Sequence, residues 1–278
     1  MGQASVGFVG AGRIGAPMVE RLLAAGHRVS LFTRRAEIGA ELAAAGAELV
    51  PDVREIGQSD VVVSCLYSDV QVLEVLPEVV GAMESNSVLV SHTTGAPDTL
   101  RRLDEFARTG RAAVVDAAFS GTPDAVRAGS LVVYLGGDAH HVGTVREVIG
   151  AYAGTVIPTG GRGSAMLVKL LNNVLFAAIS QVTLLGIAGA RELGIEESSL
   201  LEALGVSSGG STAGRYIAAR GGSEQYSDSV IPFLRKDLAA CREVAAVSGI
   251  DLTALLRVAG EGPMNLGDIT SMDKGVTR

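Results

Sequence analysis

The chain has 278 residues, which is enough for one large domain or two ordinary ones. Hydrophobic residues make up 47% and charged residues 19%, which excludes a disordered chain. The formal net charge is −7 with no basic stripe, so we expect no binding to nucleic acid. The two cysteines lie apart in apolar sequence and the chain start lacks a signal-peptide pattern, so we expect a cytoplasmic protein with no membrane partner.

Short apolar runs alternate with segments of helix length up to about residue 160. This alternation predicts βαβ units that build a parallel sheet covered by helices on both faces. The predicted strands are 5–10, 28–33, 48–50, 61–66, 88–92, 113–119, 131–135 and 155–158. The sequence therefore predicts a doubly wound α/β domain over residues 1–162.

The strand signal stops after this region, which predicts an all-helical second domain over residues 163–278. The stretch 174–190 carries no charge, but its 17 residues reach only the lower limit for a membrane span. Lys169, Asn172 and Gln181 interrupt its surroundings, which favours a helix buried between domains or subunits. So much apolar helix predicts a homo-oligomer, a dimer or a tetramer.

The turn after the first predicted strand contains a glycine motif, G-x-G-x-x-G, which reads Gly10-Ala11-Gly12-Arg13-Ile14-Gly15. The first glycine makes a tight turn, the second lets a pyrophosphate approach the backbone, and the third lets helix pack on strand. The pyrophosphate then lies at a helix N-terminus, which favours anions. An ordinary tight loop is the alternative, but the motif lies within one βαβ unit. It therefore predicts a Rossmann-type domain that binds a dinucleotide.

The end of the second predicted strand indicates which nicotinamide nucleotide binds. An NAD site usually has an acidic side chain there, whereas this chain has Thr33, Arg34 and Arg35. Guanidinium groups form charge-assisted hydrogen bonds with phosphate oxygens, so the two arginines favour the 2′-phosphate of NADP. The alternative is that one or both are solvated residues at a helix start, and NAD then remains the alternative cofactor.

A lysine and two amides occur in the apolar segment that opens the second domain. Lys169 and Asn173 are four residues apart and hence on one face of a helix, with Asn172 beside them. Burying such groups without partners costs roughly several kcal/mol. These residues must therefore face a polar cleft or pair with another group. The pattern alone leaves open whether these residues are functional or only bridge to a neighbouring loop.

At this point the sequence resembles the β-hydroxyacid dehydrogenase family, which includes 3-hydroxyisobutyrate dehydrogenase, tartronate semialdehyde reductase and the glyoxylate/succinic semialdehyde reductases. The resemblance covers essentially the whole chain, and four motifs occur in the family's order. They read GFVGAGRIGAPM from residue 7, DAAFSGT from residue 116, GSAMLVKLLNN from residue 163 and KDL from residue 236.

The resemblance implies a role for each matching residue. It makes Lys169 the catalytic residue, with Asn173 and Ser120 at the reaction site and with Gly121 and Thr122 completing substrate binding. Residues implied at the cofactor, beyond the glycine motif and residues 33–35, are Leu66, Tyr67, Thr94 and Lys236. Taken without the resemblance, Thr94 fits a helix N-cap, Lys236 a solvated surface charge and Ser120 a turn residue.

Three residues depart from the family pattern. Thr122 replaces the second glycine of the substrate loop, Ala118 replaces its proline, and Ala165 replaces the second glycine before the lysine. A β-branched side chain does not readily adopt backbone angles that glycine tolerates. We therefore expect the carboxylate-binding loop to be reshaped, which affects the choice of substrate and not the type of reaction.

The function implied is hydride transfer between NADP and a small β-hydroxy acid or semialdehyde, with Lys169 as general acid/base. The four histidines lack the spacing of metal ligands, so we expect no metal. One alternative is an imine reductase, which shares the architecture but in the members considered does not keep this lysine. A second alternative is a regulatory protein that binds NADP without turnover.

Overall fold

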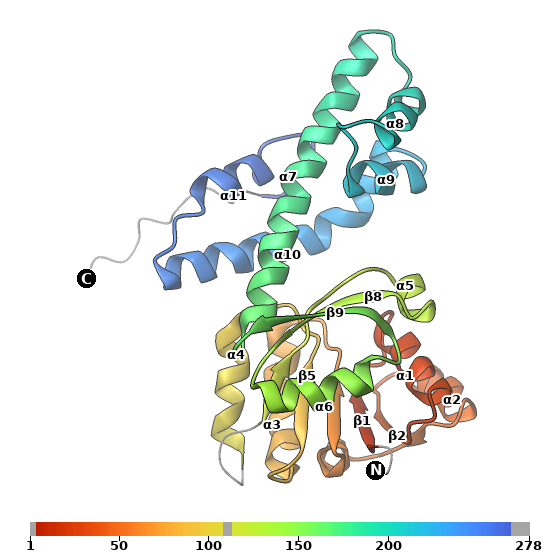
Figure 1. Ribbon diagram of the computed structural model, residues 1–278, viewed down its shortest axis with the longest axis vertical. Helices are drawn as coiled ribbons and strands as arrows, with labels where there is room; N and C mark the ends of the chain where they lie inside the picture. The colour runs from red at the N-terminus through yellow and green to blue at the C-terminus, as the bar shows by residue number, and fades with distance from the viewer. Residues whose placement is uncertain (1–3, 108–112, 268–278) are drawn as a thin grey trace. The chain divides into compact units, whose positions relative to one another are not determined.

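The computed structural model describes residues 4–107 and 113–267. It divides into two compact units, residues 1–169 and 170–278 (Figure 1). The long helix α7 (Ser164–Glu192) begins in the first unit and continues into the second. The sequence pattern predicts a domain boundary just before this helix, between residues 162 and 163.

Within the described residues, one mixed sheet forms the centre of the first unit. Its strands follow the order β3-β2-β1-β4-β5-β6-β8-β7, and β9 pairs with β8. Strands β2 and β4 pair with opposite edges of β1, so the order in which the chain adds strands to the sheet reverses there. Doubly wound folds bind their ligands at such a switch point. The strands are β1 (Val6–Val9), β2 (Val29–Phe32), β3 (Glu48–Leu49), β4 (Val61–Ser64), β5 (Val88–Ser91), β6 (Val114–Asp116), β7 (Phe119–Ser120), β8 (Leu131–Gly136) and β9 (Ala153–Gly160).

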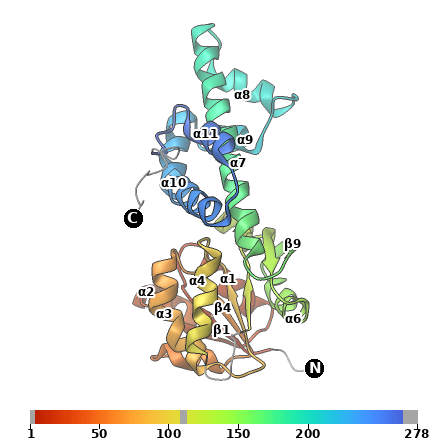
Figure 2. The same cartoon turned by 90° about the vertical axis from the view of Figure 1, so that its left-hand side faces the viewer.

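Helices cover both faces of this sheet, as the near-continuous apolar strands require. Successive strand residues point to opposite faces: Phe8 and Val63 join the core beneath α1 and α6, whereas Val9 and Val62 join the core beneath α3. Figure 2 shows α3 and α4 on one side of the strands and α6 on the other. The helices are α1 (Gly15–Ala24), α2 (Ala36–Ala44), α3 (Asp69–Ala82), α4 (Pro97–Arg102), α5 (Pro123–Arg127) and α6 (Ala139–Ile149), with 3-10 turns η1 (Val53–Gln58) and η2 (Leu103–Phe106).

All eight predicted strands are present, but the sixth is divided and the sheet is not wholly parallel. The Ala117 amide still donates to Ser91 of β5, whereas the Ala118 carbonyl accepts from Tyr134 of β8. The chain thus changes partner between these two residues. It ends β6 and starts β7, and β8 runs antiparallel to both. Strand direction depends on this long-range pairing, which the apolar pattern does not encode.

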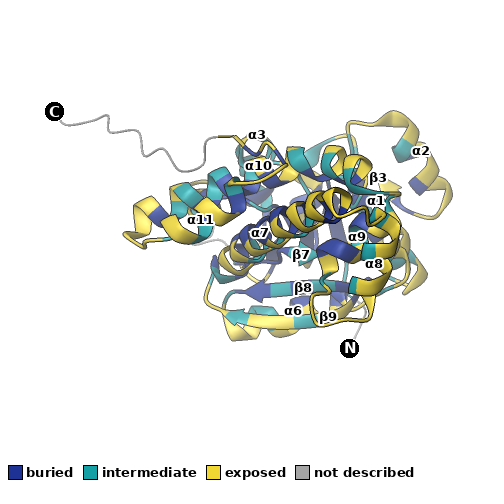
Figure 3. Ribbon diagram, turned by 90° about the horizontal axis from the view of Figure 1, so that it is seen from above, coloured by how far each residue is buried: buried dark blue, intermediate teal, exposed yellow. Residues whose placement is uncertain are grey.

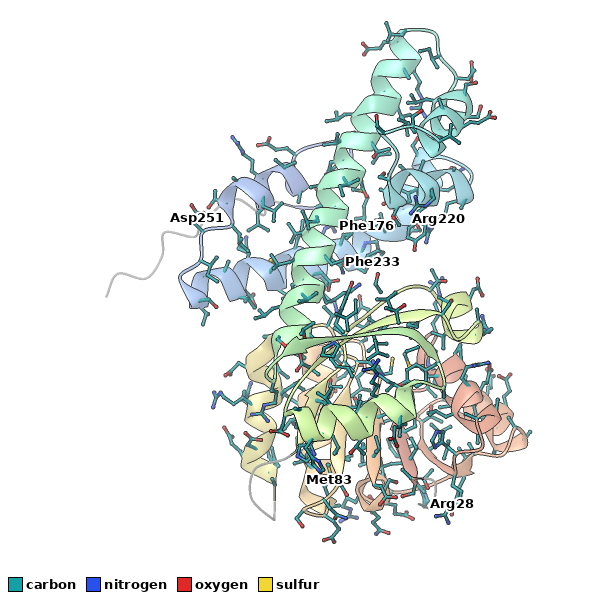
Figure 4. The ribbon with its side chains drawn as sticks, viewed as in Figure 1. Arg28, Met83, Phe176, Arg220, Phe233 and Asp251 are labelled. Atoms are coloured by element: carbon teal, nitrogen blue, oxygen red, sulfur yellow. The ribbon has the colours of Figure 1, made fainter. Side chains whose placement is uncertain are left out.

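The second unit is helical throughout its described residues, as predicted. Its helices, beyond α7, are α8 (Glu197–Gly205), α9 (Thr212–Ala219), α10 (Ser223–Ser248) and α11 (Thr253–Gly260). Phe176 of α7 packs edge-on against Tyr216 and Tyr226, and Arg220 lies over both tyrosine rings (Figure 4).

Helix α7 is long and apolar enough to cross a membrane by length and composition, and half of an 18-residue apolar stretch of it is buried inside the protein. Its polar side chains have protein partners. Ser180 hydrogen-bonds the Tyr226 hydroxyl, and the Gln181 amide group donates to the Met264 carbonyl and accepts from its N–H. These contacts fit a core helix, and Figure 3 shows buried and exposed residues alternating along it.

Candidate functional site

The glycine loop after β1 has the geometry that its sequence predicts. Gly10 has a φ of +95°, which favours glycine, and a Cβ there would lie 2.5 Å from the Cys65 carbonyl oxygen. A Cβ on Gly15 would lie 2.2 Å from the Gly10 carbonyl oxygen, so α1 packs directly on the turn. A Cβ on Gly12 would meet no protein atom within 4 Å. This open approach, next to the start of α1, fits the pyrophosphate of a dinucleotide.

Two further loops are joined to one another at the same edge of the sheet. The Thr93 hydroxyl, after β5, donates to the Leu66 carbonyl, after β4, at 3.0 Å. The Asp69 carboxylate at the start of α3 accepts from the Ala96 amide at 2.9 Å. The structure thereby brings Leu66, and with it Tyr67 and Thr94, into loops at the carboxyl ends of neighbouring strands. Helix α4 is capped at Ala96, so Thr94 is not its N-cap.

The residues expected to select the cofactor follow β2, which pairs with β1 along the side away from β4. The Thr33 hydroxyl accepts from the Arg35 amide at 3.2 Å, and Arg35 precedes α2 as its N-cap residue. Arg34 and Arg35 are exposed, and neither guanidinium pairs with a carboxylate among the described residues. Both charges therefore remain available to an anionic ligand.

The expected substrate loop follows β6. Ser120 ends β7 and pairs with Val132 of β8, so it is a strand residue. Gly121 has a φ of +143°, and a Cβ there would lie 2.8 Å from a Leu131 methyl group. Thr122 adopts an ordinary extended conformation and its hydroxyl caps α5, so the expected backbone conflict does not arise. Threonine therefore occupies position 122 without backbone strain.

The start of α7 is held by a buried carboxylate that the sequence analysis did not single out. Asp116, the last residue of β6, accepts hydrogen bonds from the amides of Gly163 (2.6 Å), Ala165 (2.8 Å) and Met166 (3.1 Å). Burial raises the pKa of this carboxyl group above its usual value, and the three N–H donors oppose that rise. Lys169 follows within the next turn of the helix and is partly exposed.

The second unit holds the next polar group of α7. Asn173 is buried, and its side-chain amide donates to Asp237 Oδ2 of α10 at 2.5 Å. Lys236 Nζ lies 3.4 Å from the other Asp237 oxygen, and 30% of the lysine side chain is exposed. Asp237 thus joins Asn173 to Lys236. Asp237 lies within the fourth motif, but it was assigned no role from the sequence; its position next to Lys236 was the available signal.

A buried histidine braces the chain where β6 ends. His92 Nδ1 lies 2.5 Å from the Ala117 carbonyl oxygen, and Nε2 lies 2.8 Å from the Tyr152 hydroxyl. Burial lowers the pKa of His92 from its usual 6.5 to about 4. The ring is therefore neutral at ordinary pH, with Nδ1 donating to the carbonyl and Nε2 accepting from the tyrosine.

Sheet order and glycine loop together define a protein with a dinucleotide-binding domain. Residues 5–161 match the family described as the NAD binding domain of 6-phosphogluconate dehydrogenase. An NAD-dependent L-serine dehydrogenase of Pseudomonas aeruginosa is 31% identical over 216 residues, 75% of this chain and 71% of that one. A 3-hydroxyisobutyrate dehydrogenase of the same organism is 28% identical over 212 residues, 75% and 71% of the two chains. The chain belongs to the β-hydroxyacid dehydrogenases of the 3-hydroxyisobutyrate dehydrogenase type.

Solved structures share this fold. The 3-hydroxyisobutyrate dehydrogenase of Mycobacterium tuberculosis, described with L-serine, has a TM-score of 0.81 at 22% identity, covering 93% of this chain and 92% of that one. An imine reductase of Streptomyces aurantiacus has a TM-score of 0.63 at 21% identity, covering 91% and 90%. The fold is thus common to two chemistries, and the site has to distinguish them.

Proposed function

We propose that this NAD(P)-dependent hydroxyacid dehydrogenase uses NADP(H), acts on a small β-hydroxy acid or its semialdehyde, and employs Lys169 as general acid/base. The observation that carries the proposal is the spacing of Lys169 and Asn173, four residues apart on one helix, in a chain of this family. Asn173 is buried and oriented by Asp237, as a substrate-positioning amide requires.

The nicotinamide, when bound, supplies or accepts the hydride at the carbon that bears the substrate oxygen. As a carbonyl is reduced, negative charge grows on its oxygen, and an ammonium group directed at that oxygen stabilises the charge and donates the proton. In the oxidative direction the neutral amine accepts the hydroxyl proton. Proton transfer by a positioned side chain typically contributes about 10² to 10⁴ in rate, and we assign this contribution to Lys169.

The remaining residues bind and orient. We assign recognition of the substrate carboxylate to Ser120 and Gly121, which lie at the end of β7, where the resemblance places the family's substrate loop. Thr122 supports this loop by capping α5. We assign the nicotinamide side of the cofactor site to Thr94 and Leu66, and the phosphate side to the glycine loop.

NADP is proposed over NAD because Arg34 and Arg35 are exposed and carry no carboxylate partner among the described residues. A 2′-phosphate would give either guanidinium a charge-assisted hydrogen bond. The relative named NAD-dependent shows that membership of the family does not settle the cofactor. Each cofactor is therefore measured separately.

We also propose a homo-oligomer, a dimer or a tetramer, that works in the cytoplasm. In the second unit, α7 exposes Leu175 (50%), Val182 (59%) and Leu185 (53%), which recur at helical spacing. Such an apolar stripe is better covered by another copy than by water. Sedimentation at micromolar concentration tests this, and a species at the 28.4 kDa chain mass would refute it. The cysteines are unpaired, which fits a reducing compartment.

The proposed reaction is tested by nicotinamide absorbance with NADP and NAD over a panel of small substrates. The panel includes 3-hydroxyisobutyrate and L-serine, which occur in the names of similar proteins, together with short semialdehydes and a cyclic imine. We expect turnover of a β-hydroxy acid or semialdehyde, faster with the NADP pair. Turnover of the imine alone would favour an imine reductase. Dinucleotide binding without turnover of any compound would favour a regulatory protein.

A further inference from the structure

The N-terminus of α7 lacks a cap of its own. Gly163 precedes the helix with a φ of +94° and has no side chain to accept from the first amides. A helix leaves its first N–H groups without intrahelical partners, and a buried end requires another acceptor. Asp116 supplies that acceptor from β6, a strand distant in sequence, with Oδ1 on Gly163 and Oδ2 on Ala165 and Met166.

This carboxylate lies between two parts of the proposed site within the first unit. Asp116 comes four residues before Ser120 in the chain, and the amides it binds come just before Lys169 on α7. It has no exposed surface, so water does not compete for its oxygens. We call the Asp116 carboxylate and the three amides that it binds the Asp116 clamp.

The surrounding chain is shaped to leave room for the Asp116 clamp. A Cβ on Gly136 of β8 would lie 2.6 Å from Asp116 Oδ1 and 2.7 Å from Ser164 Oγ. The Ser164 hydroxyl hydrogen-bonds Thr159 of β9, whose hydroxyl donates to the Leu135 carbonyl. Strands β6, β8 and β9 therefore all contribute to fixing the first turn of α7.

We propose that Asp116 is a positioning residue for catalysis, which sets the place of Lys169 relative to Ser120 by fixing the start of α7. The inference rests on the proposed function, because it takes Lys169 as the acid/base. A helix is rigid, so a displacement of its first turn is carried to Lys169. Misplacing a catalytic group by about 1 Å can cost about 100-fold in rate.

The first test is Asp116→Asn, which keeps the shape but leaves a side-chain NH₂ facing at least one of the backbone donors. We expect kcat to fall by about 10- to 100-fold while the cofactor Kd changes by less than about twofold. Val29→Ala is the matched control, because Val29 is buried in β2, a strand that pairs with β1 and β3 and not with the strands of the Asp116 clamp. If Val29→Ala and Asp116→Asn lower kcat equally at equal loss of Tm, Asp116 is only structural and the proposal is wrong.

A second variant disturbs the Asp116 clamp without changing the carboxylate. Gly136→Ala places a methyl group against Asp116 and Ser164, and we expect it to lower kcat in the same way as Asp116→Asn. Gly143→Ala in α6 is its control, since a Cβ there meets nothing within 4 Å. Unchanged kcat in Gly136→Ala, with faster amide exchange at Ala165 and Met166, would separate helix fixation from catalysis and overturn the proposal.

The double variant Asp116→Asn/Lys169→Met separates this inference from the proposed function. If Asp116 acts through Lys169, the double variant turns over no more slowly than Lys169→Met alone, because groups that act as a unit are not additive. If the two substitutions instead lower kcat by the product of their separate effects, Asp116 does not act through Lys169. If Lys169→Met itself retains turnover, the proposed function fails. If Lys169→Met is inactive but Asp116→Asn is fully active, this inference alone fails.

Discussion

Protonation of His92 should set part of the pH dependence of stability. The ring is buried between the Ala117 carbonyl and the Tyr152 hydroxyl, and burial lowers its pKa from 6.5 to about 4. Between these two values the unfolded chain binds a proton that the folded chain does not. The free energy of unfolding therefore increases as the pH rises from about 4 to 6.5, and it decreases as the pH is lowered through the same range.

The size of the effect follows from the two pKa values of His92. A difference between 6.5 and about 4, at about 1.4 kcal/mol per pH unit, corresponds to about 3 kcal/mol when the pH is below both values. About 2 kcal/mol of this is lost between roughly pH 7 and pH 5. That is a substantial share of the stability of an ordinary domain.

The assay is urea unfolding of the wild type and of His92→Asn from about pH 5 to pH 7. Asparagine can still donate to the Ala117 carbonyl but does not titrate in this range. We expect the variant to be less stable at neutral pH, because it loses the Tyr152 contact, and to lose less stability on acidification. Carboxyl groups elsewhere contribute equally to both proteins. The same pH dependence in the two proteins would refute the reasoning.

Four further substitutions address the cofactor and substrate sites. Arg34→Ala should raise the KM for NADPH by about 10- to 150-fold and leave that for NADH unchanged, because only NADPH carries the 2′-phosphate; equal effects on both in steady-state kinetics would contradict this. Gly12→Ala should weaken dinucleotide binding in titrations without lowering Tm, whereas Gly15→Ala should lower both, since only the second Cβ meets the protein. Asp237→Ala leaves the buried Asn173 amide without its acceptor, at a cost of about 1–3 kcal/mol, and should lower kcat/KM; unchanged kcat/KM would show that Asn173 is held by other contacts.

Much of the first unit could be predicted because its signals are local. Apolar runs such as Val61–Ser64 are buried on both faces of the sheet, and Gly10, Gly12 and Gly15 each have a distinct steric role that their spacing reveals. The change of strand partner between Ala117 and Ala118 could not be predicted, because it depends on hydrogen bonds to β5 and β8 far along the chain.

The candidate site likewise combines residues that local sequence patterns indicate with residues that only the fold reveals. Lys169 and Asn173 stood out as polar residues in an apolar helix. Asp116 did not, because the amides it caps lie 47 to 50 residues further on and no spacing rule connects them. Thr122 was expected to strain a glycine position, but the structure places it at an ordinary extended residue that caps a helix. Local patterns thus drew attention to Lys169 and Asn173, whereas finding Asp116 required the fold.

The role of Lys169 is tested most directly by kcat for Lys169→Met, measured with the cofactor Kd and Tm on the same preparation. Methionine is similar in length and uncharged, so the variant places no charge at this position and we expect the fold to persist. We expect kcat to fall by about 10²- to 10⁴-fold, with little change in cofactor Kd or Tm. Turnover within about threefold of wild type would contradict the assignment of Lys169 as the acid/base.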